Sequence, residues 1–266
     1  MKWLLLAKYK YVALVITALV VLLLYTTNAV TKENVDGYQS IRMPTEMILI
    51  NLDSRKDRLA SFQKYFDKSD AHNYMKLHRI SAVIGKDIPW RDGILTPTAT
   101  TSMEIMLRTG KRKNHDELTI GAIGCYMSHL KALKRVIERN EAAIICEDDL
   151  ILPSDFYKRM EIGLLLTPFE ENPLLLFHVI CNGWSQHKCT LIKPNLYKVH
   201  KFWSLACYYV TPSVAKKIVE HAKPFDVQID AMLGRLTQQS ILNIYAYPIT
   251  HTNVGLGSNI QIPLET

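Results

Sequence analysis

Short apolar runs alternate with amphipathic segments along the chain from residue 45 onwards. Strands are predicted where the apolar runs are short and rich in β-branched or aromatic residues, at 47–52, 78–83, 142–146, 174–180, 203–210 and 243–247. Helices are predicted from Ser54 and over 121–139, where apolar residues recur every three or four positions. Further helices are predicted from Thr211-Pro212, where a cap residue precedes a proline at the first helical position, and over 226–236. The alternation predicts one α/β domain with a mainly parallel twisted sheet and helices on both faces.

Residues 85–119 interrupt this pattern, because they are rich in Thr, Gly, Pro and charge. A loop this long inside a compact domain is usually functional or mobile, so we expect irregular structure here. The basic run 108–113 is expected to be solvated within the loop, with anion binding as the alternative.

An uncharged apolar segment at residues 11–30 follows three lysines and is long enough to span a bilayer. The basic flank predicts a cytoplasmic N-terminus and an exported domain, luminal in the ER or Golgi if the source is eukaryotic. A cleaved signal peptide is the alternative, because residues 27–29 have small side chains at the cleavage spacing. The expected order is a tail, a type II transmembrane signal-anchor, a polar stem and a catalytic domain, at 1–10, 11–30, 31–44 and 45–266.

Composition and charge narrow the class of protein. The chain is 48% hydrophobic, which suits a packed globular domain, and its formal charge is +7. The excess is diffuse and suits anionic substrates or a membrane surface rather than nucleic acid. The five cysteines show no metal-binding spacing. Cys181 and Cys189 could pair in an oxidising compartment, although sequence does not fix connectivity.

Three consecutive carboxylates, Glu147, Asp148 and Asp149, follow the buried run 142–146. In open α/β sheets, ligands bind at the carboxyl ends of strands. Adjacent acids at such a position repel one another and lose hydration, so a cation is needed to make the cluster tolerable. A hard divalent ion is the natural ligand. The alternative is a solvated acidic turn.

Several stretches, in the same order along the chain, carry a family resemblance. They lie at residues 50–58, 121–129, 146–152, 203–215, 224–226 and 247–260. Together they resemble glycosyltransferase family 25, which includes bacterial lipooligosaccharide galactosyltransferases and animal collagen galactosyltransferases. Each motif alone is weak, but motifs in register over residues 45–262 form a specific pattern.

The resemblance implies a GT-A-like enzyme that uses a divalent metal, typically Mn²⁺, and a UDP-sugar donor. The expected reaction is inverting transfer of a hexose, typically galactose from UDP-galactose, to a hydroxyl of a glycan or of a lipid-linked or protein-linked acceptor. A metal that bridges the diphosphate stabilises the leaving group. Glu147 and Asp149 are the implied ligands, with Asp149 first, and Asp148 is expected to point towards ribose or sugar hydroxyls. His251 is either an additional ligand or a packing residue.

The acceptor hydroxyl must lose a proton, so a carboxylate base is expected. Asp226 matches the family's P-x-D motif and is the first candidate, with a helix N-cap as the alternative role. Asp230 is the second candidate, because residues i and i+4 share a helix face. Asn182-Gly183 are expected on the acceptor side.

The donor nucleotide is expected to contact residues after the first strand and near the start of the helix at 121–139. The candidates are Asn51, Asp53, Arg55, Arg58, Ser128 and His129. Arg58 is either a phosphate ligand or a solvated helix charge. His129 is either a donor contact or a hydrogen-bonded structural residue.

Two other functions stay open. A catalytically inactive binding or adhesion module has no need for the acidic triplet and Asp226, which argue against it. A different metal enzyme, such as a phosphohydrolase, would need a nucleophile or a water-activating site, and no second carboxylate-rich motif supports one. The sequence does not identify the sugar or the acceptor.

Overall fold

The computed structural model describes residues 41–112, 114, 116–168, 172–181, 188–253 and 255. The chain divides into Met1–Ile41 and Arg42–Thr266, and every element below belongs to the second unit. The expected transmembrane segment, residues 31–40 of the stem, and Asn182-Gly183 lie outside the described residues. None of the described helices is both long enough and apolar enough to cross a bilayer.

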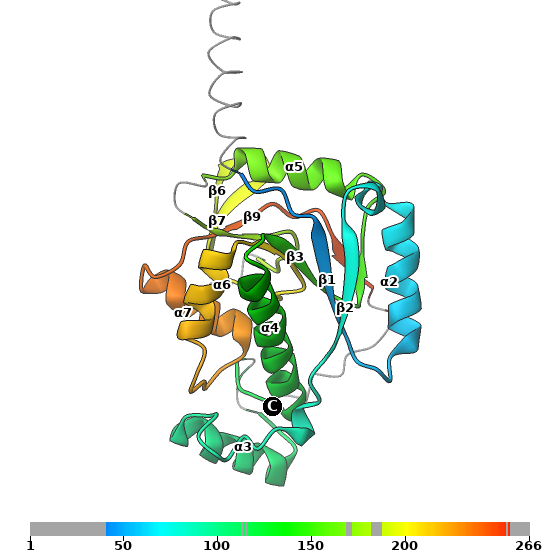
Figure 1. Ribbon diagram of the computed structural model, residues 1–266. Coiled ribbons are helices and arrows are strands. Elements are labelled where there is room, and N and C mark those ends of the chain that lie inside the picture. Colours follow the sequence, from blue (N-terminus) through cyan, green and yellow to red (C-terminus); the bar gives the residue numbers. More distant parts are fainter. Residues whose placement is uncertain are drawn as a thin grey trace, which may run out of the picture. The chain divides into compact units, whose positions relative to one another are not determined.

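A central eight-stranded sheet has the strand order β2-β1-β3-β8-β5-β9-β7-β6 (Figure 1). Its strands are β1 (Glu46–Asn51), β2 (Lys76–Ser81), β3 (Ala143–Glu147), β5 (Leu174–Leu176), β6 (Lys188–Lys193), β7 (Leu196–Lys201), β8 (Cys207–Val210) and β9 (Ile244–Ala246). A separate two-stranded sheet pairs β4 (Leu150–Ile151) with β10 (His251–Thr252).

The sheet is mixed, so the prediction of a mainly parallel sheet is wrong. Parallel pairing joins β1 to β2, β1 to β3 and β5 to β9. The pairs β3–β8, β5–β8, β7–β9 and β6–β7 are antiparallel. β8 is buried along its whole length, as a parallel strand would be, and burial on both faces does not reveal strand direction.

Helices cover both faces of the sheet, as predicted. They are α2 (Lys56–Lys68), α3 (Pro97–Thr109), α4 (Ile120–Arg139), α5 (Phe156–Leu166), α6 (Pro212–Glu220) and α7 (Ile229–Gln238). The helices α4, α6 and α7 share a hydrophobic core with Ile48, Ile145 and Tyr208 of the sheet. The alternate residues Met47 and Ile144 are fully buried on the opposite face, because successive strand side chains point in opposite directions. Figure 1 shows α5 on the side of the sheet away from α4.

The loop expected at 85–119 contains the 13-residue helix α3. Thr96 caps it by accepting a hydrogen bond from the Ala99 amide, Pro97 is its first residue, and Gly110 ends it with a φ of 72°. The same signals correctly predict α6, where Thr211 caps and Pro212 begins the helix. The Thr-rich composition of 96–101 obscures them in α3, because β-branched residues lower helix propensity.

The first turns of α4 lie so close to the backbone of the segment after β2 that no side chain fits between them. A Cβ atom on Gly124 would lie 2.6 Å from the Val83 carbonyl oxygen, and one on Gly85 would lie 1.8 Å from the Ile120 carbonyl oxygen. Only glycine permits this approach between the segment after β2 and the first turns of α4. The approach brings the α4 side chains Cys125, Ser128 and His129 to the ends of β1 and β3.

The structure pairs Cys181 with Cys189 in a disulfide, as the sequence allowed. Cys125, Cys146 and Cys207 are free thiols, of which the last two are buried. Sγ of Cys146 lies 3.2 Å from Sγ of Cys207 across the β3–β8 pair.

Candidate active site

Two cavities meet at the carboxyl end of β3. The first, the β1 cavity, has a volume of about 440 Å³ and is lined by Ile50, Arg58, Gly85, Ser128, His129 and Asp148 among others. The second, the α7 cavity, has a volume of about 350 Å³, and its lining includes Arg112, Trp203, Gln228, Asp230 and Thr252. Cys125, Glu147 and Asp149 line both. Glu147 and Asp149 of the acidic triplet therefore form, with Cys125, a wall shared by two cavities at the carboxyl end of a strand, where ligands bind in open α/β sheets.

Asp148 is held entirely by protein groups. Its Oδ1 accepts a hydrogen bond from Arg58 Nη1 at 2.9 Å, and its Oδ2 accepts one from Asn51 Nδ2 at 2.7 Å. Asn51 also accepts a hydrogen bond from Arg79 Nε at 2.8 Å. Arg58 is buried, so the alternative of a solvated helix charge is wrong. These contacts tie the ends of β1 and β3 to α2.

Asp149 has the least satisfied carboxylate of the triplet. Its Oδ2 lies 3.6 Å from Arg58 Nη1, while its buried Oδ1 has no hydrogen-bond partner among the described residues. Burial, with the negative charge of Glu147 next in size, raises the pKa of Asp149 to about 6. A buried acceptor oxygen without a donor is unfavourable unless a cation or a ligand satisfies it. Asp149 Oδ1 therefore fits a divalent cation.

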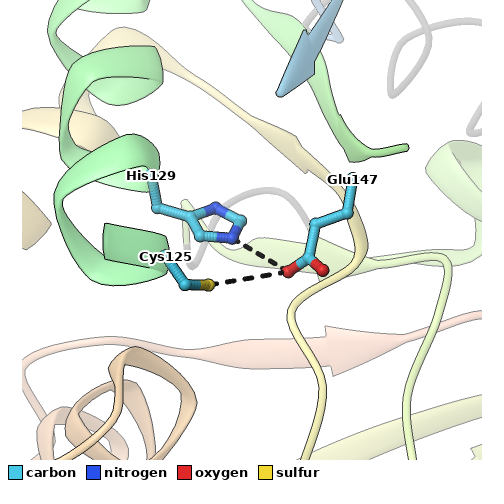
Figure 2. Close-up of side chains that lie close together, drawn as sticks. All are labelled: Cys125, His129 and Glu147. Carbon is cyan, nitrogen blue, oxygen red and sulfur yellow. Dashed lines mark hydrogen bonds and ion pairs between the residues drawn. The ribbon is translucent and has the colours of Figure 1, made fainter. Parts of the chain in front are cut away.

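Glu147, the last residue of β3, faces α4 (Figure 2). Its Oε1 lies 3.2 Å from His129 Nε2 and 3.9 Å from Cys125 Sγ. Burial raises the pKa of Glu147, but the hydrogen bond and charge of His129 and the charges of His178 and Arg58 more than offset it, so the net shift is downward. The pKa of Cys125 is raised by burial and by neighbouring acids.

Ser128 and His129 are buried and held by neighbouring protein groups. Ser128 Oγ donates a hydrogen bond to the Gly124 carbonyl at 2.7 Å and accepts one from the Val83 amide at 2.8 Å. His129 Nδ1 lies 3.0 Å from the Tyr208 hydroxyl. Both residues line the β1 cavity, so they shape its wall while binding neighbouring protein groups.

Asp230 projects into the α7 cavity at the start of α7. Its Oδ2 accepts a hydrogen bond from the Ser204 amide at 2.9 Å, and its Oδ1 accepts one from the Ala231 amide at 2.8 Å. Burial raises the pKa of Asp230, partly offset by these two amides. Ser204 has a φ of 75°, a strained conformation for a residue with a side chain, and such strain often accompanies functional sites.

Asp226 lies away from both cavities. The helix α7 begins at Ile229 with Gln228 as its N-cap, so Asp226 is neither the N-cap nor on a helix face shared with Asp230. Asp226 accepts a hydrogen bond from Arg235 Nη1 at 2.6 Å and lines a small third cavity of about 80 Å³. The prediction that the helix begins at residue 226 is wrong, because residues 223–228 form an irregular segment.

Asp53, Arg55 and His251 lie near the site without lining either cavity in the described structure. Asp53 pairs with Arg79, and Arg55 pairs with Asp57 at 2.8 Å. His251 is exposed in β10, opposite Ile151. The backbone amide of Asn253, two residues after His251, donates a hydrogen bond to the Asp149 carbonyl at 2.6 Å, so the segment 251–253 supports the acidic turn through its backbone.

Sequence reasoning missed several residues of the site. Trp203 and Ser204 line the α7 cavity, and His178 Nδ1 lies 2.9 Å from Ser204 Oγ. Cys125 was detectable, because it precedes His129 by four positions and the two therefore share a helix face. Ser204 and Asp230 are 26 positions apart in the chain, so no local sequence pattern predicts their contact.

Comparison with known proteins adds an independent finding. The model of "Glycosyltransferase family 25 (LPS biosynthesis protein)" matches residues 44–233. Procollagen galactosyltransferase 1-B of Xenopus laevis is 29% identical over 119 residues, which are 44% of this chain and 18% of that protein. Procollagen galactosyltransferase 2 of Homo sapiens is 29% identical over 118 residues, which are 43% of this chain and 17% of that protein. The matched region therefore spans less than a fifth of either relative.

Among solved structures, the chain is similar to UDP-glucose pyrophosphorylase complexed with UDP-glucose, with a TM-score of 0.43 and 11% identity, over 77% of this chain and 90% of that one. Apo-UDP-glucose pyrophosphorylase gives a TM-score of 0.37 and 13% identity, over 76% of this chain and 72% of that one. Both scores are too low for a shared fold to be inferred, so the GT-A-like fold stays a prediction.

Proposed function

Because this chain belongs to glycosyltransferase family 25, we propose that it transfers galactose from UDP-galactose, with inversion, to a hydroxyl of a glycan, lipid-linked or protein-linked acceptor. One observation carries the proposal. Two cavities of substrate size share a wall made of Glu147 and Asp149, and an oxygen of Asp149 has no donor among the residues that the structure describes. Such a wall suits a reaction in which a sugar passes from a nucleotide on one side to an acceptor on the other.

The β1 cavity suits the nucleotide. Its wall includes the apolar side chains Ile50, Ile84 and Ile120, which suit a flat base, and it ends at Arg58 and the acidic turn. The first residues of α4 also line it, and free amides at a helix start favour a diphosphate. Arg58 supplies positive charge there, although its closest partners are Asp148 and Asp149.

A divalent cation fits the oxygen ligands of this wall. Asp149 and Glu147 would hold it, and a bound ion of this kind stabilises the negative charge of a departing diphosphate. Asp148 would act indirectly, because Arg58 and Asn51 occupy its carboxylate and thereby position the turn. His251 is exposed and lines neither cavity, so it has no part in the proposed metal site.

Asp230 is the proposed base. It lines the α7 cavity together with Glu147 and Asp149, and its raised pKa makes its carboxylate a stronger proton acceptor than an ordinary aspartate. Trp203, in the same cavity, offers an aromatic surface of the kind that packs well against the apolar face of a sugar ring. The acceptor hydroxyl would give its proton to Asp230 as it attacks the sugar.

A transfer assay tests the proposal. The full chain would be incubated with a panel of UDP-hexoses and acceptors, with and without Mn²⁺, beside the variants Asp149→Asn and Asp155→Asn. Loss of a metal ligand should lower kcat/KM on the order of 10³-fold, since metal stabilisation of the transition state amounts to several kcal/mol. Asp155 is a matched control, because it is half-exposed and pairs with Arg159 at 2.9 Å. Full metal-dependent activity of Asp149→Asn would contradict the site, and absence of transfer with every UDP-hexose would contradict the function.

A further inference from the structure

Three side chains with different donor atoms converge on one point beside the acidic turn. Cys125 and His129 lie four residues apart on α4 and therefore on one face of the helix, and Glu147 meets them from the end of β3 (Figure 2). The nearest ligand atoms of the three residues all lie within 4.8 Å of one another.

The contacts differ from those of a thiol nucleophile. In such a site the thiol contacts the imidazole, which in turn contacts a carboxylate. Here the Cys125 thiol and the His129 imidazole both contact the same oxygen of Glu147, at 3.9 and 3.2 Å. Around a tetrahedral metal with ligand distances of about 2.0–2.3 Å, neighbouring ligand atoms lie roughly 3.3–3.8 Å apart. The separations of 3.9 and 3.2 Å from Glu147 need little adjustment, and the Cys125 and His129 ligand atoms, which lie within 4.8 Å of each other, would move closer together.

We propose that Cys125, His129 and Glu147 form a binding site for a borderline-soft divalent cation of the Zn²⁺ class. One thiolate, one imidazole and one carboxylate are ligands that Zn²⁺ accepts, whereas Mn²⁺ and Mg²⁺ prefer oxygen ligands alone. Because Cys125 and Glu147 line both cavities, the fourth position of the metal would face an open space that water or a ligand can occupy.

A second layer of contacts supports the site. Metal-binding histidines usually have a hydrogen-bond partner on the other ring nitrogen, and His129 Nδ1 lies 3.0 Å from the Tyr208 hydroxyl. On binding, the Cys125 thiol would release its proton to water. His129 would bind the metal through Nε2 and donate its remaining ring proton from Nδ1 to Tyr208.

The site differs from the oxygen site proposed for the donor diphosphate, but the two share Glu147. Zn²⁺ bound to Cys125 and His129 would draw Glu147 towards α4 and away from Asp149. Inhibition of transfer by Zn²⁺ is therefore expected, and this consequence alone rests on the proposed function. Binding itself does not.

Two measurements on the full chain test binding without any sugar donor. Co²⁺ should give a thiolate-to-metal charge-transfer absorption that Zn²⁺ abolishes. Zn²⁺, but not Mn²⁺, should protect Cys125 from alkylation, as mapped by mass spectrometry, with the buried Cys146 and Cys207 as internal references. This second measurement needs no variant and is independent of whether a variant folds.

Variants then assign the ligands. Tyr208→Phe should weaken Zn²⁺ binding about 10- to 100-fold, the usual effect of removing a partner of a metal-bound histidine. Cys125→Ser should weaken Zn²⁺ binding at least as much and abolish the Co²⁺ absorption band, whereas Cys207→Ser should keep both the Zn²⁺ affinity and the band. Unchanged Zn²⁺ affinity in Cys125→Ser, failure of Zn²⁺ to protect Cys125, or loss of the band in Cys207→Ser alone would overturn the site.

Discussion

Glu147, Asp148 and Asp149 are adjacent in the chain, yet their carboxylates have different partners. Glu147 contacts His129 and Cys125, Asp148 binds Arg58 and Asn51, and Asp149 keeps one buried oxygen without a described donor. Within the triplet, Glu147 therefore contacts α4 at the wall between the two cavities, Asp148 holds the turn to β1 and α2, and Asp149 offers an oxygen that a ligand can bind. The sequence predicted the place of the cluster and ranked Asp149 first, but these partners come from β1, α2 and α4, which a single sequence does not bring together.

The two aspartates near the start of α7 line different cavities: Asp230 lines the α7 cavity, whereas Asp226 lines the small third cavity. We expect Asp230→Asn to lower kcat about 10²- to 10⁴-fold, because the amide cannot accept the acceptor's proton. Asp226→Asn should change kcat little, because its carboxylate pairs with Arg235 outside the α7 cavity. Steady-state kinetics of both variants, with thermal melting as a folding control, compares them directly. Normal turnover in Asp230→Asn together with loss in Asp226→Asn would restore the P-x-D residue as the base.

At the scale of elements, α4 and the segment after β2 lie too close together at Gly124 for a side chain to fit between them. We expect Gly124→Ala to destabilise the protein by about 1–3 kcal/mol, because the new methyl group would meet the Val83 carbonyl and the Gly85 amide, which are both backbone. Urea unfolding of wild type and variant measures this difference in unfolding free energy.

Gly234→Ala provides a control of opposite sign. Its Cβ would lie 3.6 Å from the His200 carbonyl oxygen, an ordinary contact, and Gly234 lies inside α7. Alanine there should stabilise the protein by up to about 1 kcal/mol through helix propensity. A destabilisation of equal size in both variants would show that the close approach at Gly124 is not the cause.

An ion pair between Arg135 and Glu46 connects α4 to β1. Arg135 donates hydrogen bonds to both carboxylate oxygens of Glu46, at 3.0 and 2.7 Å. Burial raises the pKa of Glu46, but Arg135, with the charges of Arg139 and His78, lowers it further than burial raises it. A lowered pKa in the folded state contributes stability above the unfolded-state pKa and loses it as the pH falls through the folded-state pKa.

We therefore expect Glu46→Gln to lose about 2 kcal/mol of unfolding free energy at pH 7 and progressively less as the pH falls below about 4. Unfolding curves of wild type and variant at pH 7 and pH 3 measure the change. Glu141→Gln is the control, because its pair with Arg139 is half-exposed and should matter little. A deficit of Glu46→Gln that is as large at pH 3 as at pH 7 would exclude the ion pair as its origin.

Elements with clear periodicity were predictable from sequence, and those without it were not. The runs that form β1, β3 and β9 and the helix α4 were recognised within a few residues. The hairpin β6–β7 was missed, because both strands are rich in lysine and β6 is largely exposed, and α3 was missed because of its threonines. Strand order and direction depend on pairings between segments far apart, such as β3 with β8, which local patterns do not encode.

At the scale of the whole molecule, we propose that residues 11–30 anchor the unit Arg42–Thr266 to a membrane, on the strength of their apolar sequence. Removal of residues 1–41 should move the protein from the membrane fraction to the soluble fraction while its melting temperature and metal-dependent transfer are kept. Fractionation, melting and transfer assays of both chains provide the measurement. The matched control is a chain in which a different apolar sequence replaces residues 11–30, and it should stay in the membrane fraction. Recovery of the full chain in the soluble fraction would contradict the anchor.

The strand order has a consequence for the synthesis of this protein. β8 lies between β3 and β5, although both of these strands precede it in the chain. At about 5–20 residues per second, the roughly 60 residues between β3 and β8 take on the order of 3–12 s to emerge. Until then one edge of β3, apolar on both faces, has no partner strand and can pair with another nascent chain. Production of this protein should therefore benefit from rapid, uninterrupted translation of the segment between β3 and β8 and from chaperones that shield that edge.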